Sequence, residues 1–163
     1  MKKTSILILS LLLVHQLSWA QPTDTTTVNK KRLTAFIIGA GSAYTVTLIG
    51  LNKLWYSQSE KQDFTWFNDN AEWKQVDKMG HFFSSYYFSY STASALKWTG
   101  VKPKKSDWIG ALTGFAIMLP IEIMDGHSAA YGASSGDLLA NALGSGFYLG
   151  QSLLWNEQRI YPI

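Results

Sequence analysis

Three pairs of polar side chains lie inside or at the edges of apolar segments, and their residue types are those that bind ions or share protons. The members of each pair are three or four residues apart, which places both side chains on one face of an α-helix. The pairs are Asp77 and His81, Glu122 and Asp125, and Asp137 and Asn141. Carboxylate, imidazole and amide groups together suit a divalent ion, a proton-sharing network or a set of ion pairs.

The order of these pairs along the chain predicts that they meet. The first pair begins the apolar run 79–96, the second ends the run 108–124, and the third begins the run 138–155. If these runs are helices packed as antiparallel neighbours, all three pairs lie at the same end of the bundle. We therefore expect one polar layer there, made of Asp77, Lys78, His81, Glu122, Asp125, Asp137 and Asn141.

Four carboxylates in a poorly solvated layer cannot all stay ionised without compensation. Some of them can share protons in a coupled network. In a second solution, Lys78 and His81 pair with them, helped by the positive N-terminal ends of two helices. In a third, manganese, magnesium, calcium or zinc is bound, and the candidate ligands are Asp77, His81, Glu122 and Asp137.

Each of these residues also has a purely structural interpretation. Asp77 can cap a helix, Asp137 belongs to an ordinary helix start, and a single histidine on an apolar face is usually a hydrogen-bonded core residue. Capping does not explain Glu122, which lies inside an apolar run beside Pro120. A polar network that locks the helices together is therefore the leading hypothesis, ahead of a metal site.

Four long apolar segments must position these groups. The run 33–51 has 19 residues without a charge, and as a helix it would extend about 28 Å, close to the hydrocarbon thickness of a bilayer. None of the four runs shows the two-residue alternation of a strand. We predict an all-α fold, a membrane-associated bundle of about four apolar helices. Small residues four apart predict close helix contacts in three sets: Gly110 and Gly114; Ala140 and Gly144; and Ala142, Gly146 and Gly150.

An aromatic and polar segment precedes the second apolar run. It is expected either to lie along a membrane interface or to cover the polar layer as a lid. Its members are Trp66, Phe67, Asn68, Asp69, Asn70 and Trp73. His127 follows the third run and either joins the layer or is solvated.

Composition excludes several classes of protein. The 163 residues are 47% hydrophobic and 15% charged, with a formal charge of +3 and no cysteine. Low charge and long apolar runs exclude a disordered chain, and the missing cysteine excludes disulfide, zinc-thiolate and thiol chemistry. A nucleic-acid partner is not expected, because no basic stripe is visible. Membrane lipid is the expected partner, and no protein partner is indicated.

The first 20 residues have the layout of a secretory signal: a basic start, a short apolar core and small residues before the cleavage point. We expect a signal peptide at 1–20, a flexible leader at 21–32, one helical domain at 33–158 and a tail at 159–163. A cleaved signal places the mature N-terminus outside the cytoplasm, whereas seven basic residues in two loops favour the cytoplasmic side. Either one segment does not cross a membrane, or the helices pack on its surface.

Several short motifs resemble the YfiM-like envelope family, a domain of unknown function. They are Phe67-Asn68-Asp69-Asn70, Trp73, Asp77-Lys78-x-Gly80-His81, Glu122-x-x-Asp125-Gly126 and Ser135-Gly136-Asp137-x-x-x-Asn141-x-x-Gly144. A looser similarity reaches VanZ-like membrane proteins, which usually carry an arginine before the final Asp that this chain lacks. The resemblance implies a predicted periplasmic lipoprotein, although the chain has no cysteine to carry a lipid, and it implies no established activity.

Two functions are compatible with these patterns. The first is a cell-envelope protein whose polar layer fixes helix packing and binds a lipid head group or a partner. The alternative is a metal-assisted hydrolase or transferase that acts on an envelope lipid or glycan.

Overall fold

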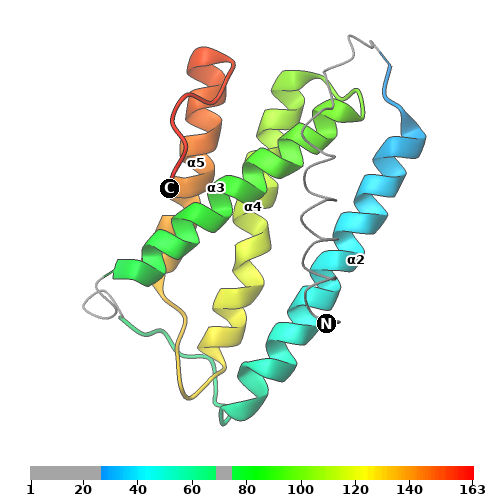
Figure 1. Ribbon diagram of the computed structural model, residues 1–163. Coiled ribbons are helices and arrows are strands. Elements are labelled where there is room, and N and C mark those ends of the chain that lie inside the picture. The colour runs from blue at the N-terminus through cyan, green and yellow to red at the C-terminus, as the bar shows by residue number, and fades with distance from the viewer. Residues whose placement is uncertain (1–26, 69–74) are drawn as a thin grey trace, which may run out of the picture.

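Four long helices make up the computed structural model, which describes residues 27–68 and 75–163 (Figure 1). The helices are α2 (Lys30–Leu54), α3 (Val76–Trp98), α4 (Pro103–Gly126) and α5 (Ser135–Trp155), with a short 3₁₀ turn, η2 (Tyr56–Gln58), after α2. No β-sheet occurs among the described residues, so the all-α prediction is confirmed. The predicted signal peptide and residues 21–26 of the leader lie outside the described ranges.

The helix ends carry ordinary stop and start signals. Asn29 caps α2, its side-chain oxygen accepting the Arg32 N–H at 3.1 Å, and Pro103 opens α4, where a missing N–H costs nothing. The Ser134 hydroxyl accepts the N–H groups of Gly136 and Asp137 and so starts α5. Every helix extends a few residues beyond its charge-free run.

Helices α3, α4 and α5 form an antiparallel bundle in which glycines allow the backbones to touch. A Cβ atom added to Gly110 would lie 2.6 Å from the Ser89 carbonyl oxygen of α3. At Gly144 of α5 it would collide with the Phe82 carbonyl oxygen, also on α3. Two of the three predicted small-residue sets therefore lie at helix contacts, and α3 packs closely against both of its neighbours.

The third set faces outward. Ala142 and Gly146 are exposed, Gly150 is half-buried, and a Cβ atom on either glycine would meet nothing within 4 Å. The inner face of α5 is already occupied by Ala140 and Gly144, and a residue two positions further along is rotated to the opposite side of a helix. This part of the packing prediction is wrong for the isolated chain.

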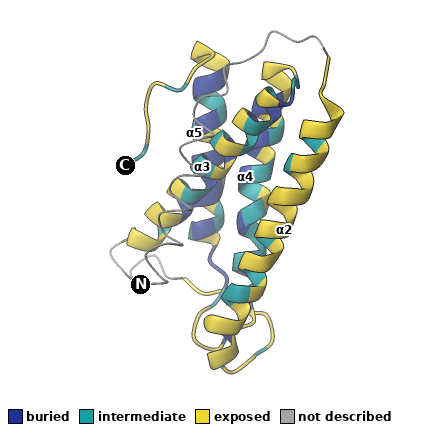
Figure 2. Cartoon of the chain, turned by 45° about the vertical axis from the view of Figure 1, so that its right-hand side comes forward, coloured by how far each residue is buried: buried dark blue, intermediate teal, exposed yellow. Residues whose placement is uncertain are grey.

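The bundle inverts the usual distribution of side chains. Its largest fully buried side chains are Tyr86, Tyr148, Asn141, Thr99, Ser85, Ser89 and Ser106. Its outer faces carry large apolar side chains, such as Leu112 at 65% exposed and Leu139 at 60%. Figure 2 shows most of the buried residues on the inner faces of the three helices. Water-soluble domains bury most of their large aliphatic side chains, whereas this bundle exposes many of them.

Helix α2 lies beside the bundle without joining its interior. None of its residues is buried, and Figure 2 shows it exposed along its length. A hydrogen bond holds its middle, donated by the Tyr44 hydroxyl to the Ile117 carbonyl oxygen of α4 at 2.7 Å. Its start is held by the backbone N–H of Asn29, which donates to the Thr99 carbonyl oxygen at 2.8 Å.

The residues after α5 fold back along the bundle (Figure 1). The Gln151 side-chain oxygen accepts the backbone N–H groups of Arg159 and Ile160, at 3.0 and 2.8 Å. The Tyr86 hydroxyl donates to the side-chain oxygen of Gln158 at 3.1 Å. The segment that the sequence suggested was a simple tail thus satisfies buried polar groups of α3 and α5.

Two glycines of α5 should respond to alanine with opposite signs. Gly144→Ala places a methyl group against the α3 backbone and should lower the free energy of unfolding by about 1–3 kcal/mol. Gly146→Ala meets open space and should raise it by about 0.5–1 kcal/mol, because alanine is the better helix former. Denaturant unfolding of the purified protein in detergent measures both. Equal effects of the two substitutions would contradict the close approach of α3 and α5.

Candidate functional site

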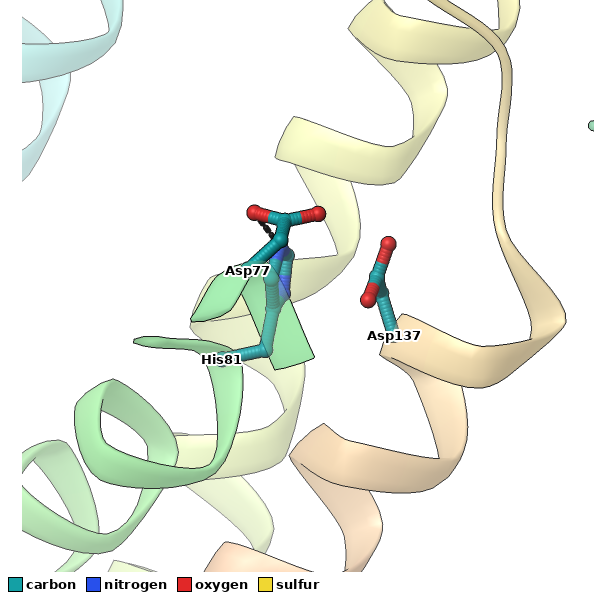
Figure 3. Close-up of side chains that lie close together, drawn as sticks. All are labelled: Asp77, His81 and Asp137. Atoms are coloured by element: carbon teal, nitrogen blue, oxygen red, sulfur yellow. Dashed lines mark ion pairs between the residues drawn. The ribbon is translucent and has the colours of Figure 1, made fainter. Parts of the chain in front are cut away.

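The antiparallel order brings three helix ends together at one pole of the bundle. These are the start of α3, the end of α4 and the start of α5. In Figure 3, Asp77 and His81 of α3 lie opposite Asp137 of α5. The polar groups of distant segments are therefore neighbours, which is the geometric condition for a site.

His81 is the centre of this polar site, and it is 8% exposed. Its Nε2 atom lies 3.8 Å from Asp77 Oδ1, within the same helix. Its Nδ1 atom lies 3.4 Å from Glu122 Oε1 of α4 and 3.2 Å from Asn141 Oδ1 of α5. One imidazole ring thus contacts acceptor oxygens from all three helices.

Glu122 joins α4 to the start of α5. The side chain is buried, and its Oε2 atom accepts the Ser134 backbone N–H at 3.1 Å. Its Oε1 atom has no hydrogen bond, and neither does the equally buried Nδ2 atom of Asn141. Buried polar atoms without a partner are costly, so this acceptor and this donor are available to a bound group.

Lys78 and Asp137 add a second pair of opposite charges to the site. The Lys78 Nζ atom lies 3.2 Å from Asp137 Oδ1, and the side chains are only 13% and 6% exposed. A buried pair of this kind is strongly destabilised when one partner is removed, because the other charge is left uncompensated. The polar site therefore holds three carboxylates, of Asp77, Glu122 and Asp137, against two groups that can be cationic.

The geometry also contains a possible ligand set for a metal ion. Ligand atoms of Asp77, His81 and Asp137 lie within 4.8 Å of one another. Asp77 is exposed at the rim, whereas His81 and Asp137 are buried, so an ion has both a route in and a sheltered position. Two carboxylates and an imidazole suit manganese or zinc in particular.

Asp125 lies at the same pole but has a different partner. Its Oδ1 atom accepts the Tyr56 hydroxyl at 2.7 Å, a contact that ties the turn after α2 to the end of α4. His127 is also separate from the polar site: it is exposed, and its Nδ1 atom lies 2.9 Å from the Ile123 carbonyl oxygen. Tyr56 carries no sequence signal for this role, because an aromatic residue after an apolar helix is equally typical of a membrane interface.

Only part of the expected lid lies within the described residues. Asp69, Asn70 and Trp73 fall outside them, and Asn68 is the last residue described before the gap. The segment before Asn68 pairs with the loop that leads into α5: the Phe67 N–H donates to the Ala133 carbonyl oxygen at 2.9 Å. The Trp66 and Phe67 side chains are exposed, so this stretch borders the polar site through its backbone.

A second polar cluster lies at the opposite pole, and the sequence analysis missed it. Asp107 of α4 is buried, with its Oδ1 atom 2.6 Å from Lys97 Nζ and 2.6 Å from the Tyr148 hydroxyl. The sequence signal of Asp107 was weak, because an aspartate near the start of a helix is common for purely local reasons. The cluster joins the end of α3, the start of α4 and the interior of α5.

One known family matches more than half of the chain. The family model described as "Predicted periplasmic lipoprotein (DUF2279)" matches residues 63–152. The chain belongs to this family. The matched region starts after α2 and contains the whole polar site, in agreement with the YfiM-like resemblance. No curated protein and no solved structure matches the chain.

Two substitutions of Glu122 test whether its contacts stabilise the bundle. Glu122→Gln keeps an oxygen that can accept the Ser134 N–H, whereas Glu122→Leu leaves that buried N–H without a partner. Glu122→Leu should therefore lower the free energy of unfolding by about 1–3 kcal/mol more than Glu122→Gln does. The comparison uses thermal or denaturant unfolding in detergent. Equal stability of the two variants would show that these hydrogen bonds do not hold the site.

Proposed function

We propose that this family member is an exported, membrane-embedded envelope protein whose polar site locks three helices and binds a polar head group. The observation that carries the proposal is the inverted bundle: mainly small and polar residues with two tyrosines inside, and many leucine, isoleucine and other aromatic residues outside. With no water to compete, such helices associate through small residues and interhelical hydrogen bonds. A water-soluble bundle with this surface would be prone to aggregate.

The dimensions of the helices support this environment. Helices α2 and α4 have 25 and 24 residues, and both are long and apolar enough to cross a bilayer. Their calculated lengths are about 36 Å, slightly more than the hydrocarbon core. Partly exposed aromatic residues occur at both poles, Trp98 and Trp155 at one and Trp55 and Trp66 at the other. Aromatic belts of this kind lie at membrane–water interfaces.

Export to the envelope is supported by two independent features. The segment 1–20 has the layout of a secretory signal, and the family is described as periplasmic. The chain contains no cysteine to carry a lipid, so we assign the membrane attachment to its apolar helices.

The head-group role rests on the polar site. Glu122 Oε1, which lies 3.4 Å from His81 Nδ1, and Asn141 Nδ2 form no hydrogen bond with a described residue, and both are buried beneath the exposed rim formed by Asp77. A hydroxyl-bearing head group offers one donor and one acceptor and would satisfy both. At the membrane surface, the polar site would receive such a group without removing its acyl chains from the lipid.

The membrane proposal predicts the effect of replacing an outward-facing leucine with a charged residue. Leu112, near the middle of α4, is 65% exposed, and Leu112→Arg should prevent stable membrane integration because a central arginine costs about 2.5–3.5 kcal/mol there. The matched control is Leu154→Arg, at a residue 74% exposed but one position from the end of α5, where arginine reaches the interface. Alkaline carbonate extraction of membranes gives the readout.

The unmodified chain and the control should stay in the carbonate pellet, and Leu112→Arg should be lost from it or degraded. Recovery of the unmodified chain in the supernatant would remove the proposal. So would full tolerance of Leu112→Arg, which is the result expected of a surface residue in water.

A second function is favoured by the ligand geometry of Asp77, His81 and Asp137. In this alternative, the chain is a metal-assisted hydrolase or transferase for an envelope lipid or glycan. The three side chains, joined by Glu122, would hold a divalent ion that activates a water molecule or polarises the substrate.

Metal analysis separates the two functions. The alternative predicts one tightly bound ion in the purified protein, its loss in Asp137→Ala, and its retention in Asp63→Ala, which removes an exposed carboxylate that is not part of the site. Elemental analysis after dialysis against excess manganese or zinc measures the stoichiometry. A protein that stays metal-free under these conditions would exclude the metal-assisted function and leave the head-group site.

A further inference from the structure

Two basic segments that are far apart in the sequence meet at the pole opposite the polar site. The Asn29 N–H donates to the Thr99 carbonyl oxygen at 2.8 Å, so the start of α2 lies against the end of α3. The Arg32 Nη1 atom lies 3.4 Å from the Trp98 carbonyl oxygen, and its guanidinium lies 4.9 Å from the centre of the Trp98 ring. The lysines before α2 and those of the loop between α3 and α4 therefore belong to one surface.

We call this surface the basic end. Its members are Lys30, Lys31, Arg32, Lys97, Lys102, Lys104 and Lys105. Lys97 is neutralised by the buried Asp107, and the nearby Arg159 pairs with Glu157 at 2.8 Å. The other six members are exposed, and none forms an ion pair with a described residue. The basic end thus carries a large uncompensated positive charge.

At the opposite pole, the described acidic residues outnumber the described basic ones. Its described acids are Glu60, Asp63, Asp77, Glu122, Asp125 and Asp137, and its described bases are Lys53, Lys61 and Lys78. The charge is therefore distributed along the helix axes, from a basic pole to an acidic one, even though the net charge of the chain is small. General solubility does not require such a separation, since interspersed charges would serve equally well.

Tryptophans border the basic end on the lateral faces of the bundle. Trp98 of α3, Trp108 of α4 and Trp155 of α5 are 36%, 46% and 37% exposed. Below them, away from the pole, the outer faces continue with leucine and isoleucine. Basic side chains above a ring of tryptophan and an apolar surface match the order of layers in a membrane leaflet: phosphates, interface and acyl chains.

We propose that the basic end binds the phosphate groups of anionic phospholipids in one leaflet, and so holds the polar site at the other face of the membrane. This inference rests on the proposed membrane embedding and adds the class of lipid and the direction of the molecule. Arg32 and the α4 lysines reach the phosphates, while Trp98, Trp108 and Trp155 lie at the glycerol level. An RNA or acidic protein ligand would leave the tryptophan ring and the apolar surface unexplained.

Lipid titration of the purified full-length protein in neutral-detergent micelles tests the proposal. The probes are dioleoylphosphatidylglycerol, dioleoylphosphatidylcholine and soluble glycerol 1-phosphate, and tryptophan fluorescence and thermal unfolding are the readouts. Phosphatidylglycerol should bind at least tenfold more tightly than phosphatidylcholine, and the preference should disappear in 0.5 M salt.

Matched double variants locate the effect. Lys104→Gln with Lys105→Gln removes two of the exposed charges and should weaken phosphatidylglycerol binding about tenfold or more. Lys53→Gln with Lys61→Gln removes two exposed lysines at the opposite pole and should leave binding unchanged.

Three results would overturn the proposal that the basic end binds anionic phospholipid. They are no preference for phosphatidylglycerol, equal effects of the two double variants, or equally tight binding of glycerol 1-phosphate, which would indicate a site for free anions. If the protein still resists carbonate extraction in such a case, the membrane proposal stands and only the lipid assignment fails.

Discussion

The structure depends on the close contact of the α3 backbone with its two neighbours. Gly110 and Gly114 of α4 and Gly144 of α5 leave no space for a Cβ atom against α3. Helices whose backbones touch leave little room for large aliphatic side chains between them, so the interior contains mainly serine, alanine and a few larger groups such as Tyr86 and Tyr148. Many of the bulky apolar residues consequently lie outside, and they form the surface on which the membrane proposal rests.

The same contact explains why the polar groups collect at the poles. Antiparallel helices bring alternating ends together, and helix ends are where unpaired backbone N–H groups require acceptors. Glu122 meets this need by accepting the Ser134 N–H just before α5, and it also contacts His81. At the other pole, Asp107 joins Lys97 to Tyr148. Each polar cluster therefore connects three helices at one pole of the bundle, beyond the glycine contacts.

Sequence reasoning was strongest where a pattern repeats and weakest where a contact depends on chance proximity. The four helices follow from charge-free runs, and the grouping of Asp77, Glu122 and Asp137 follows from helix spacing and direction. The contact between Asp125 and Tyr56 does not follow from any pattern, because Tyr56 lies 69 residues away on a turn without periodicity. The folded-back segment that bonds Gln151 was missed for the same reason: short irregular stretches acquire their conformation from the surface they meet.

The separateness of α2 has a consequence for where the family-matched region begins. The helix contributes no buried residue, and the family match begins after it, at residue 63. The interior of α3, α4 and α5 therefore contains no residue of α2. The family-matched region coincides with this three-helix body, so the boundary of the family falls where the buried interior begins.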